Sequence, residues 1–321
     1  MHSLLAKLLR FCNKYSKGYN MTWITGTINT ADAWSGIAYG NGRFVTVANI
    51  SANSSYSTDG ITWTQGTVQP ISPTRYFYKG IMPVSAYWQD ITFGNGKFMA
   101  IATGAYSAVS IDGANWTFVS LPNPKNWQSV TYGSPYFVAV GSGFATKFGY
   151  PYGNRVVAVT PDPHDWGNSI MDQGMPWTAI TYGLGQFVAI TSNSNSSSSS
   201  SRGASWITSN TMPVSQSWTS IAFGANKFVA VGDSNIAAYS TDGLTWTASE
   251  MPSNSNWTSI AYGNGTFVTV ANNSANAAVS TDGVNWTAEA MSVNKPWTAV
   301  TFGQDRFVAV AGNTTTTAVR V

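Results

Sequence analysis

Residues that could carry out catalysis are few in this sequence, and they form no recognisable constellation. Glycoside hydrolysis needs two opposed carboxylates, yet the two glutamates, Glu250 and Glu289, both lie in connecting segments. The two histidines, His2 and His164, cannot build a metal site or a triad between them. No Gly-x-Ser-x-Gly motif marks a serine nucleophile. We therefore expect a protein that is not an enzyme and that uses no cofactor or metal.

The aspartates fall into two groups. Five lie at one position of a repeated turn, namely Asp59, Asp112, Asp162, Asp242 and Asp282. The other six form no pairwise motif and are Asp32, Asp90, Asp165, Asp172, Asp233 and Asp305. Because the five turn aspartates are far apart in the chain and belong to different repeats, we do not expect them to share a metal ion.

Composition excludes several classes of partner. Only 9% of the residues are charged and the net charge is +3, without a run of Lys and Arg of the kind that binds phosphates, so we expect no nucleic acid. No apolar stretch is long enough to span a membrane. Aromatic residues make up 14% of the chain, which is typical of a folded protein. The single cysteine, Cys12, excludes an internal disulfide.

Tryptophan reveals an internal repeat. One series opens the motif W-x-x-[IV]-x-[YF]-G, with a Phe ten residues after each Trp, and comprises Trp34, Trp88, Trp127, Trp177, Trp218, Trp257 and Trp297. The second series comprises Trp23, Trp63, Trp116, Trp166, Trp206, Trp246 and Trp286. Six members of the second series end a motif that is clearest as S-T-D-G-x-x-W. Such regular self-similarity is the signature of a repeat architecture.

Each repeat predicts four short strands. The first is typified by 257–262 and the second by 267–270, with the hairpin signal Gly263-Asn264-Gly265 between them. Residues 277–280 form the third strand, and the fourth begins near Trp286. Successive apolar residues in the first two strands favour sheets covered on both faces. We predict an all-β fold, a seven-bladed β-propeller of four-stranded blades; a two-sheet sandwich is the alternative.

The ends of the chain predict how the ring closes. The last repeat supplies three strands and then stops, while Thr22-Trp23 precedes the first repeat at the spacing of a fourth strand. The N-terminal strand is therefore expected to complete the C-terminal blade and to remove the exposed edges. This defines a propeller domain at 21–321 and a separate N-terminal segment at 1–20.

Over 21–321 the repeats resemble the Asp-box (BNR, sialidase-like) propeller repeats. In that family the Asp box is a structural turn, and the resemblance implies this role for the five turn aspartates. The resemblance is imperfect, because Asp and Gly are adjacent here in Asp59-Gly60 and its counterparts, and Arg202 replaces the aspartate in the fourth repeat. A sialidase would also need an arginine triad and a Tyr–Glu pair, and neither is recognisable.

Two insertions break the regular spacing. The segment from Trp63 to Trp88 is about 14 residues longer than its counterparts, and the segment from Phe137 to Trp166 about ten. Strand alternation puts both on one face of the disc. Because exposed aromatic residues with Arg are typical of binding hot spots, we predict a binding face formed by Arg75, Tyr76, Phe77, Tyr78, Lys79, Phe144, Lys147, Phe148, Tyr150, Tyr152 and Arg155. The alternative is that these rings pack the loops themselves.

Residues 1–20 are expected to form a short amphipathic helix. Leu4, Leu8, Phe11 and Tyr15 share one helical face, and basic residues occupy another. We interpret the segment as a docking element for another protein. A translation-start artefact upstream of Met21 is the alternative.

The resemblance and the composition together suggest a function. A surface rich in Ser, Thr and Asn, an anchor-like N-terminal segment and the family resemblance look like a bacteriophage virion surface protein, either a tail fibre that binds the host receptor or a capsid or tail decoration. Its partners would be other virion proteins, through residues 1–20, and a glycan or protein on the host surface. The alternatives are a soluble, extracellular lectin-like propeller that binds glycans and a degenerate glycoside hydrolase.

Overall fold

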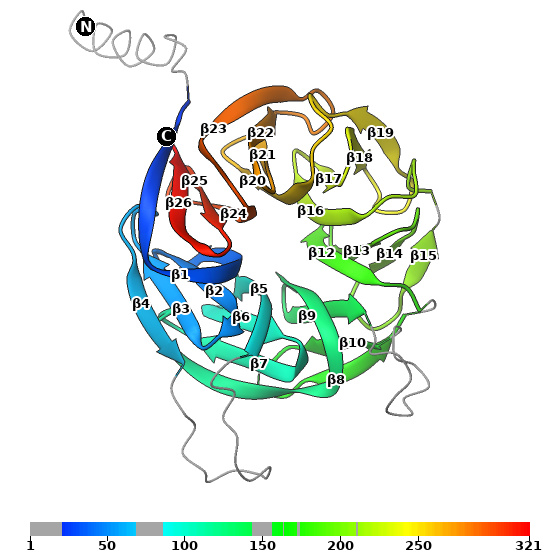
Figure 1. The fold of residues 1–321 in the computed structure, drawn as a ribbon. Helices are drawn as coiled ribbons and strands as arrows, with labels where there is room; N and C mark the ends of the chain where they lie inside the picture. The colour runs from blue at the N-terminus through cyan, green and yellow to red at the C-terminus, as the bar shows by residue number, and fades with distance from the viewer. Residues whose placement is uncertain (1–20, 69–85, 143–155, 163, 172–173, 210) are drawn as a thin grey trace, which may run out of the picture.

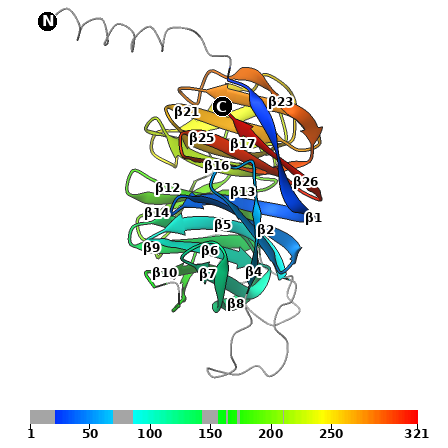
Figure 2. The same cartoon turned by 90° about the vertical axis from the view of Figure 1, so that its left-hand side faces the viewer.

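The computed structural model describes residues 21–68, 86–142, 156–162, 164–171, 174–209 and 211–321. All regular structure in these residues is β-strand, arranged as seven blades of four antiparallel strands around an axis, with four of the blades linked into one 14-stranded sheet (Figure 1). Seen from the side, the sheets stack like blades within a disc (Figure 2). The predicted β-propeller is therefore confirmed over the sandwich alternative. The predicted helix at 1–20 lies outside the described residues. No described helix has the length and apolarity needed to cross a membrane.

The blades follow one another along the chain, and each runs from an inner to an outer strand. Blade 1 contains the second half of β1 (Trp23–Gly40), then β2 (Arg43–Ser51), β3 (Asn53–Ser57) and β4 (Thr64–Val68). Blade 2 contains β5 (Ala86–Gly94), β6 (Lys97–Ala102), β7 (Gly104–Ser110) and the first half of β8 (Asn115–Gly133). Blade 3 contains the second half of β8, β9 (Tyr136–Ser142), β10 (Val156–Thr160) and β11 (Gly167–Ile170).

The remaining blades keep the same order. Blade 4 contains β12 (Trp177–Gly183), β13 (Gln186–Thr191), β14 (Ser197–Ser200) and β15 (Ile207–Ser209). Blade 5 contains β16 (Trp218–Gly224), β17 (Lys227–Gly232), β18 (Ile236–Ser240) and β19 (Thr247–Glu250). Blade 6 contains β20 (Trp257–Gly263), β21 (Thr266–Ala271), β22 (Ser274–Ser280) and β23 (Thr287–Lys295). Blade 7 contains β24 (Trp297–Gly303), β25 (Arg306–Ala311) and β26 (Thr314–Arg320), followed by the first half of β1.

Strand β1 joins the two ends of the chain. Its first half pairs antiparallel with β26, with Trp23 opposite Arg320 and Thr27 opposite Thr316. Backbone hydrogen bonds of 3.0 Å in both directions link Thr22 and Val321. The N-terminal strand thus supplies the outer strand of the last blade, at the expected register. The second half of β1 turns inward and becomes the inner strand of blade 1 (Figure 1).

The repeated motif has a clear packing reason. The Gly that ends each inner strand faces the aromatic ring of the motif in the next blade, so closely that an added Cβ would lie 2.0–2.2 Å from a ring carbon. The pairs are Gly40–Phe93, Gly94–Tyr132, Gly133–Tyr182, Gly183–Phe223, Gly224–Tyr262, Gly263–Phe302 and Gly303–Tyr39. The last pair joins blade 7 to blade 1. Only glycine leaves room for the neighbouring blade at this position.

The hydrophobic core lies between successive blades. All seven tryptophans of the first series are buried, and each apolar cluster combines residues of two neighbouring blades. The cluster around Trp34, for example, contains Phe44 of blade 1 together with Val308 and Val310 of blade 7. Apolar side chains on both faces of each sheet are thereby removed from water, which explains why the inner strands are not cleanly alternating.

Candidate binding site at strand β5

The turn aspartates organise the turns that precede the second tryptophan series. In blade 1 the Asp59 carboxylate accepts the N–H groups of Ile61 and Thr62, each at 2.8 Å, while Ser57 Oγ accepts the N–H of Gly60 at 2.8 Å. The same bonds recur around Asp112, Asp242 and Asp282. Burial by itself would raise the pKa of Asp112, but the hydrogen bonds from Asn115, Ala114 and Ser110 together outweigh it and bring the pKa to about 2. These carboxylates are occupied by their own turns.

Blade 4 keeps the turn without the carboxylate. Gly203, which follows Arg202, has a φ of 71°, and a Cβ there would lie 2.7 Å from Val138 of blade 3. In blade 1 the equivalent Gly60 has a φ of 76°, and a Cβ there would lie 2.6 Å from Val308. Ser200, whose counterparts donate to the aspartate, has a buried hydroxyl with no hydrogen-bond partner. The turn of this blade therefore lacks an acceptor that its neighbours have.

Two partly exposed arginines, Arg43 and Arg306, make hydrogen bonds between blades. Arg43 Nη1 donates to the carbonyl oxygen of Asp112 in the next blade at 2.8 Å, and its guanidinium lies 4.8 Å from the centre of the Tyr56 ring. Arg306 donates to the carbonyl oxygen of Asp59 at 3.3 Å. The position before the repeat Phe is therefore an inter-blade contact, a role that linear spacing does not reveal.

Strand β5 has residues around Trp88 that most or all other blades lack. The residue before the tryptophan is Tyr87, where the other blades have Ala33, Asn126, Pro176, Ser217, Asn256 and Pro296. The residue after it is Gln89, which blade 3 matches with Gln128. The other five blades have a hydroxyl there, which donates to the tryptophan carbonyl of the next blade at 2.5–2.8 Å. The second residue after it is Asp90, where the other blades have Gly, Ala or Ser.

Asp90 is an enclosed carboxylate at the contact between blades 2 and 3. Its Oδ2 accepts Ser129 Oγ at 2.8 Å and the Val130 N–H at 2.9 Å, and its Oδ1 accepts the Ile91 N–H at 2.8 Å. Burial raises the pKa of Asp90 to about 6, because the loss of hydration outweighs the three donors. The side chain remains partly accessible. This group can therefore take up or release a proton near neutral pH.

An exposed apolar surface lies beside Tyr87. Ile50 occupies the bulge between the two residues of β2 that pair with Tyr87 and Ala86, and it adopts a φ of 62°. At the same position other blades have Gly104, Asn193, Asn273 and Asn313, which tolerate positive φ. Ile50 is 62% exposed and Tyr87 is 53% exposed. A β-branched residue in the left-handed region costs ~1–2 kcal/mol, and burial does not compensate for it here.

A chain of neutral polar groups continues from this surface across blade 2. Gln89 Nε2 donates to Thr103 Oγ1 at 3.4 Å, Thr103 Oγ1 donates to Asn126 Oδ1 at 3.0 Å, and Asn126 Nδ2 donates to Ser142 Oγ at 3.2 Å. The Thr103 N–H also binds the Tyr87 carbonyl at 3.0 Å. We call Ile50, Tyr87, Gln89 and Thr103 the β5 site.

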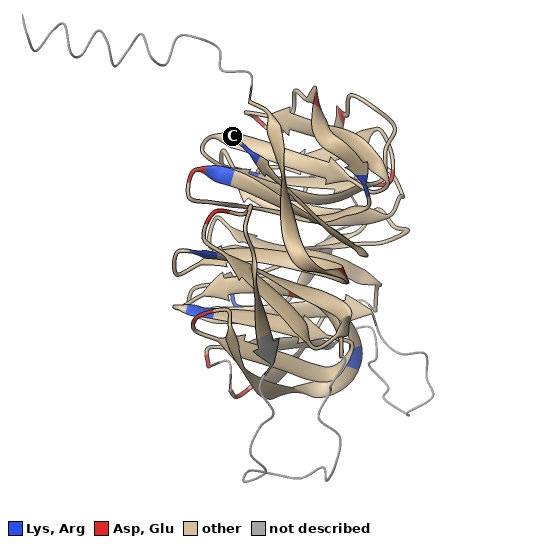
Figure 3. Ribbon diagram, turned by 60° about the vertical axis from the view of Figure 1, so that its left-hand side comes forward, with Lys and Arg blue, Asp and Glu red and all other residues tan. Residues whose placement is uncertain are grey.

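Charged groups contribute little to the β5 site. Figure 3 shows how sparsely Lys, Arg, Asp and Glu are distributed over the described strands. Lys125 lies beside Asn126 but is only 2% exposed, with Nζ 5.2 Å from the centre of the Trp127 ring, and burial lowers its pKa to about 7. The Asp32 carboxylate accepts Ser51 Oγ at 2.9 Å and Asn53 Nδ2 at 2.6 Å. No group of three or more described His, Cys, Asp or Glu side chains could hold a metal ion.

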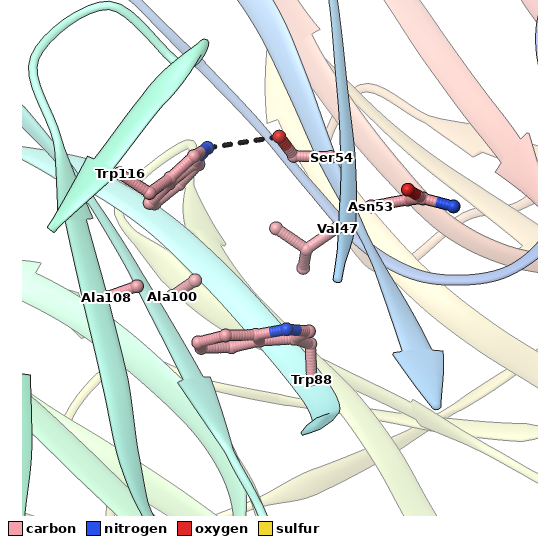
Figure 4. A pocket seen from close by; sticks show the side chains of 7 residues that line it. All are labelled: Val47, Asn53, Ser54, Trp88, Ala100, Ala108 and Trp116. Atoms are coloured by element: carbon pink, nitrogen blue, oxygen red, sulfur yellow. Dashed lines mark hydrogen bonds between the residues drawn. The ribbon is translucent and has the colours of Figure 1, made fainter. Parts of the chain in front are cut away.

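A gap between blades 1 and 2 is not a ligand site. Val47 and Asn53 line it from blade 1, and Trp88 and Trp116 from blade 2, with Trp116 Nε1 donating to Ser54 Oγ at 3.1 Å (Figure 4). The space does not admit even a water-sized molecule. It is a packing defect between two blades.

The residues of the predicted binding face lie outside the described residues. This holds for every predicted position in 75–79 and 144–155, and equally for Leu4, Leu8, Phe11 and Tyr15 of the predicted docking helix. The β5 site was not predicted. Aligning the seven repeats by their tryptophans would have pointed to it, because Ile50 and Tyr87, with the adjacent Asp90, each differ from the described residues in their column.

Known structures share the whole fold. The sequence itself matches no family model and no curated protein. A streptogramin B lyase is similar with a TM-score of 0.74 and 14% identity, covering 93% of this chain and 97% of the lyase. Virginiamycin B lyase from Staphylococcus aureus is similar with a TM-score of 0.76 and 11% identity, covering 94% of this chain and 99% of the lyase. YCF48 from Cyanidioschyzon merolae is similar with a TM-score of 0.67 and 14% identity, covering 93% of this chain and 98% of YCF48. At such identities the likeness concerns the fold, and the chain is a β-propeller protein.

These neighbours correct one prediction. We expected a protein that is not an enzyme, and that prediction is wrong, because the solved propellers similar to this chain include lyases. The physical reason is that a propeller contributes functional side chains from separate blades, far apart in sequence. A lack of linear catalytic motifs therefore says little about catalysis on this fold.

Proposed function

We propose that this chain is a surface protein of a bacteriophage virion that binds a partner through the β5 site. The observation that carries the proposal is the concentration of departures from the repeat at one place. Tyr87 is the aromatic residue of its column, the adjacent Asp90 replaces Gly, Ala or Ser, and Ile50 keeps a strained, exposed conformation where asparagine would fit. Strain that the fold does not require is a feature of functional sites.

The proposed location is the virion surface, with residues 1–20 as the attachment to the particle. The Ser-, Thr- and Asn-rich composition with few charges supports a virion surface location, and the Asp-box character of the turns supports the sialidase-like resemblance. Residues 1–20 are proposed to dock onto another virion protein. We further propose that the pairing of β1 with β26 is what holds the ring closed.

A lectin with sites repeated around the ring is the rival that the structure disfavours. Such a protein would carry equivalent side chains in each blade. Here the column of Tyr87 contains no second aromatic residue, and the column of Ile50 contains no second aliphatic residue among the described blades.

The test is attachment of the full-length protein to the bacterial cells from which native particles are recovered. The double variant Ile50→Asn, Tyr87→Ser is expected to lose attachment while melting at the same temperature as the parent or slightly higher, because asparagine relieves the strain at position 50. The matched control is Ile207→Ser, since Ile207 is 63% exposed on β15 of blade 4. Undiminished attachment of the double variant would refute the proposal.

A further inference from the structure

We propose that the ligand of the β5 site is a neutral carbohydrate, an inference that rests on the proposed function. The site joins an exposed aromatic ring to neutral amide and hydroxyl groups. A sugar ring has the complementary character, because one face presents C–H groups and its edge carries hydroxyls. The negative face of an aromatic ring attracts such polarised C–H groups.

The stacking surface is Tyr87 with its neighbour Ile50. The Tyr87 backbone is fixed on both sides, by pairing with Asn49 of β2 and by the 3.0 Å bond from the Thr103 N–H. Its side chain is nonetheless more than half exposed. Ile50 stands next to it in the bulge of β2. A ring held on a rigid backbone and flanked by an aliphatic group offers apolar contact at low entropic cost.

The hydroxyl partners are Gln89 and Thr103. Both can donate and accept hydrogen bonds, as sugar hydroxyls do. The bond between them is long, 3.4 Å, so a ligand hydroxyl can replace it at little cost. Behind them, Asn126 and Ser142 continue the network and keep Thr103 oriented.

Charge and polarity select against other ligands. An anionic ligand needs an accessible cation, and Lys125, which precedes Asn126 of this network, is almost completely buried over Trp127. Asp32, on the same face of blade 1, would repel it. An apolar peptide would strip water from Gln89 and Thr103 without replacing their hydrogen bonds, which is costly. A neutral, hydroxylated ligand satisfies both halves of the site.

The first experiment distinguishes glycan from protein on the cell surface. Host cells are treated either with periodate, which cleaves vicinal diols, or with protease, and attachment of the full-length protein is measured. Attachment lost after periodate and kept after protease is expected. The reverse result would overturn the carbohydrate assignment and leave the proposed function intact, provided that the Tyr87 variant still fails to attach.

The second experiment measures direct binding by calorimetry. The probes are cellohexaose, maltohexaose and chitohexaose as neutral saccharides, and hexagalacturonate as the anionic one. Tyr87→Ala is expected to weaken binding of a neutral saccharide roughly tenfold or more, whereas Tyr87→Phe retains the ring and stays within about threefold. Ile207→Ala is the control that leaves affinity unchanged. Preference for hexagalacturonate, or saccharide binding that tolerates Tyr87→Ala, would contradict the inference.

Discussion

The pKa values of two aspartates in this protein are shifted in opposite directions. On the exposed turn of blade 2, hydrogen bonds from Asn115, Ala114 and Ser110 together bring the pKa of Asp112 to about 2 even though partial burial opposes them. At the contact of blades 2 and 3, burial raises the pKa of Asp90 to about 6 although three donors oppose it. The number of donors is similar, so hydration decides the sign of the shift.

Replacing Asp90 should therefore remove a pH dependence of stability. Because its folded pKa lies above the ordinary value of 3.8, its contribution is fully present below about pH 4 and is lost as the pH rises through about 6. Asp90→Asn keeps an oxygen for the Val130 N–H but cannot ionise. We expect the variant to exceed the parent in stability at pH 8 by up to ~3 kcal/mol in urea unfolding.

Replacing Asp242 should change the stability at pH 8 in the opposite direction. The pKa of Asp242 is lowered, because hydrogen bonds led by that of the Thr245 N–H outweigh the burial that would raise it. Its stabilisation is thus present above about pH 4 and is lost as the pH falls through its lowered pKa. Asp242→Asn should therefore be less stable than the parent at pH 8. If the free energy of unfolding of the Asp90 variant changes from pH 4 to pH 8 just as that of the parent does, the raised pKa of Asp90 is refuted.

At the scale of the element, the turn in blade 4 tests the role of the Asp box. Arg202→Asp should supply the acceptor that Ser200 Oγ lacks and that the N–H groups of residues 204 and 205 would use, by analogy with Asp59. The backbone is already in the required conformation, with Gly203 at a φ of 71°. We expect a gain of ~1–2 kcal/mol in thermal unfolding.

Arg202→Ala is the control for that gain, because it removes the exposed arginine without adding an acceptor. Equal stability of the two variants would show that the carboxylate contributes nothing to this turn. That result would also weaken the structural interpretation of the aspartates in the other Asp-box turns.

The strands themselves were predictable because each repeat shows its own pattern. The hairpin Gly263-Asn264-Gly265, for example, appears with Asn264 at a φ of 46° and Gly265 at 73°. Contacts between blades were not predictable. Nothing in the spacing of Arg43 or Arg306 indicates that they reach the turn of the next blade. The β5 site required a comparison of columns, since none of its residues belongs to a motif.

At the scale of the whole molecule, the glycine–aromatic contact recurs between every pair of neighbouring blades. The glycine–aromatic contact between Gly303 and Tyr39 is equivalent to the other six, and the Thr298 hydroxyl donates to the Trp34 carbonyl at 2.8 Å as its counterparts do. Blades 7 and 1 thus meet through the same two contacts as blades 4 and 5 or blades 5 and 6. The pairing of β1 with β26 corresponds to the pairing of the third and outer strands in the other blades, such as β18 with β19, but here it joins the two ends of the chain.

Two truncated proteins should separate the contributions of the N-terminal residues. A chain that starts at Met21 keeps Trp23 and Ile28, both buried, and should melt within about 2 °C of the full-length protein. A chain that starts at Ala31 loses both side chains and leaves an edge of β26 unpaired. Loss of one buried tryptophan alone costs ~3–5 kcal/mol, and the open edge favours association of chains. Thermal unfolding and sedimentation measure the two effects. A protein starting at Ala31 that stays monomeric and melts with the parent would show that the pairing of β1 with β26 does not hold the ring together.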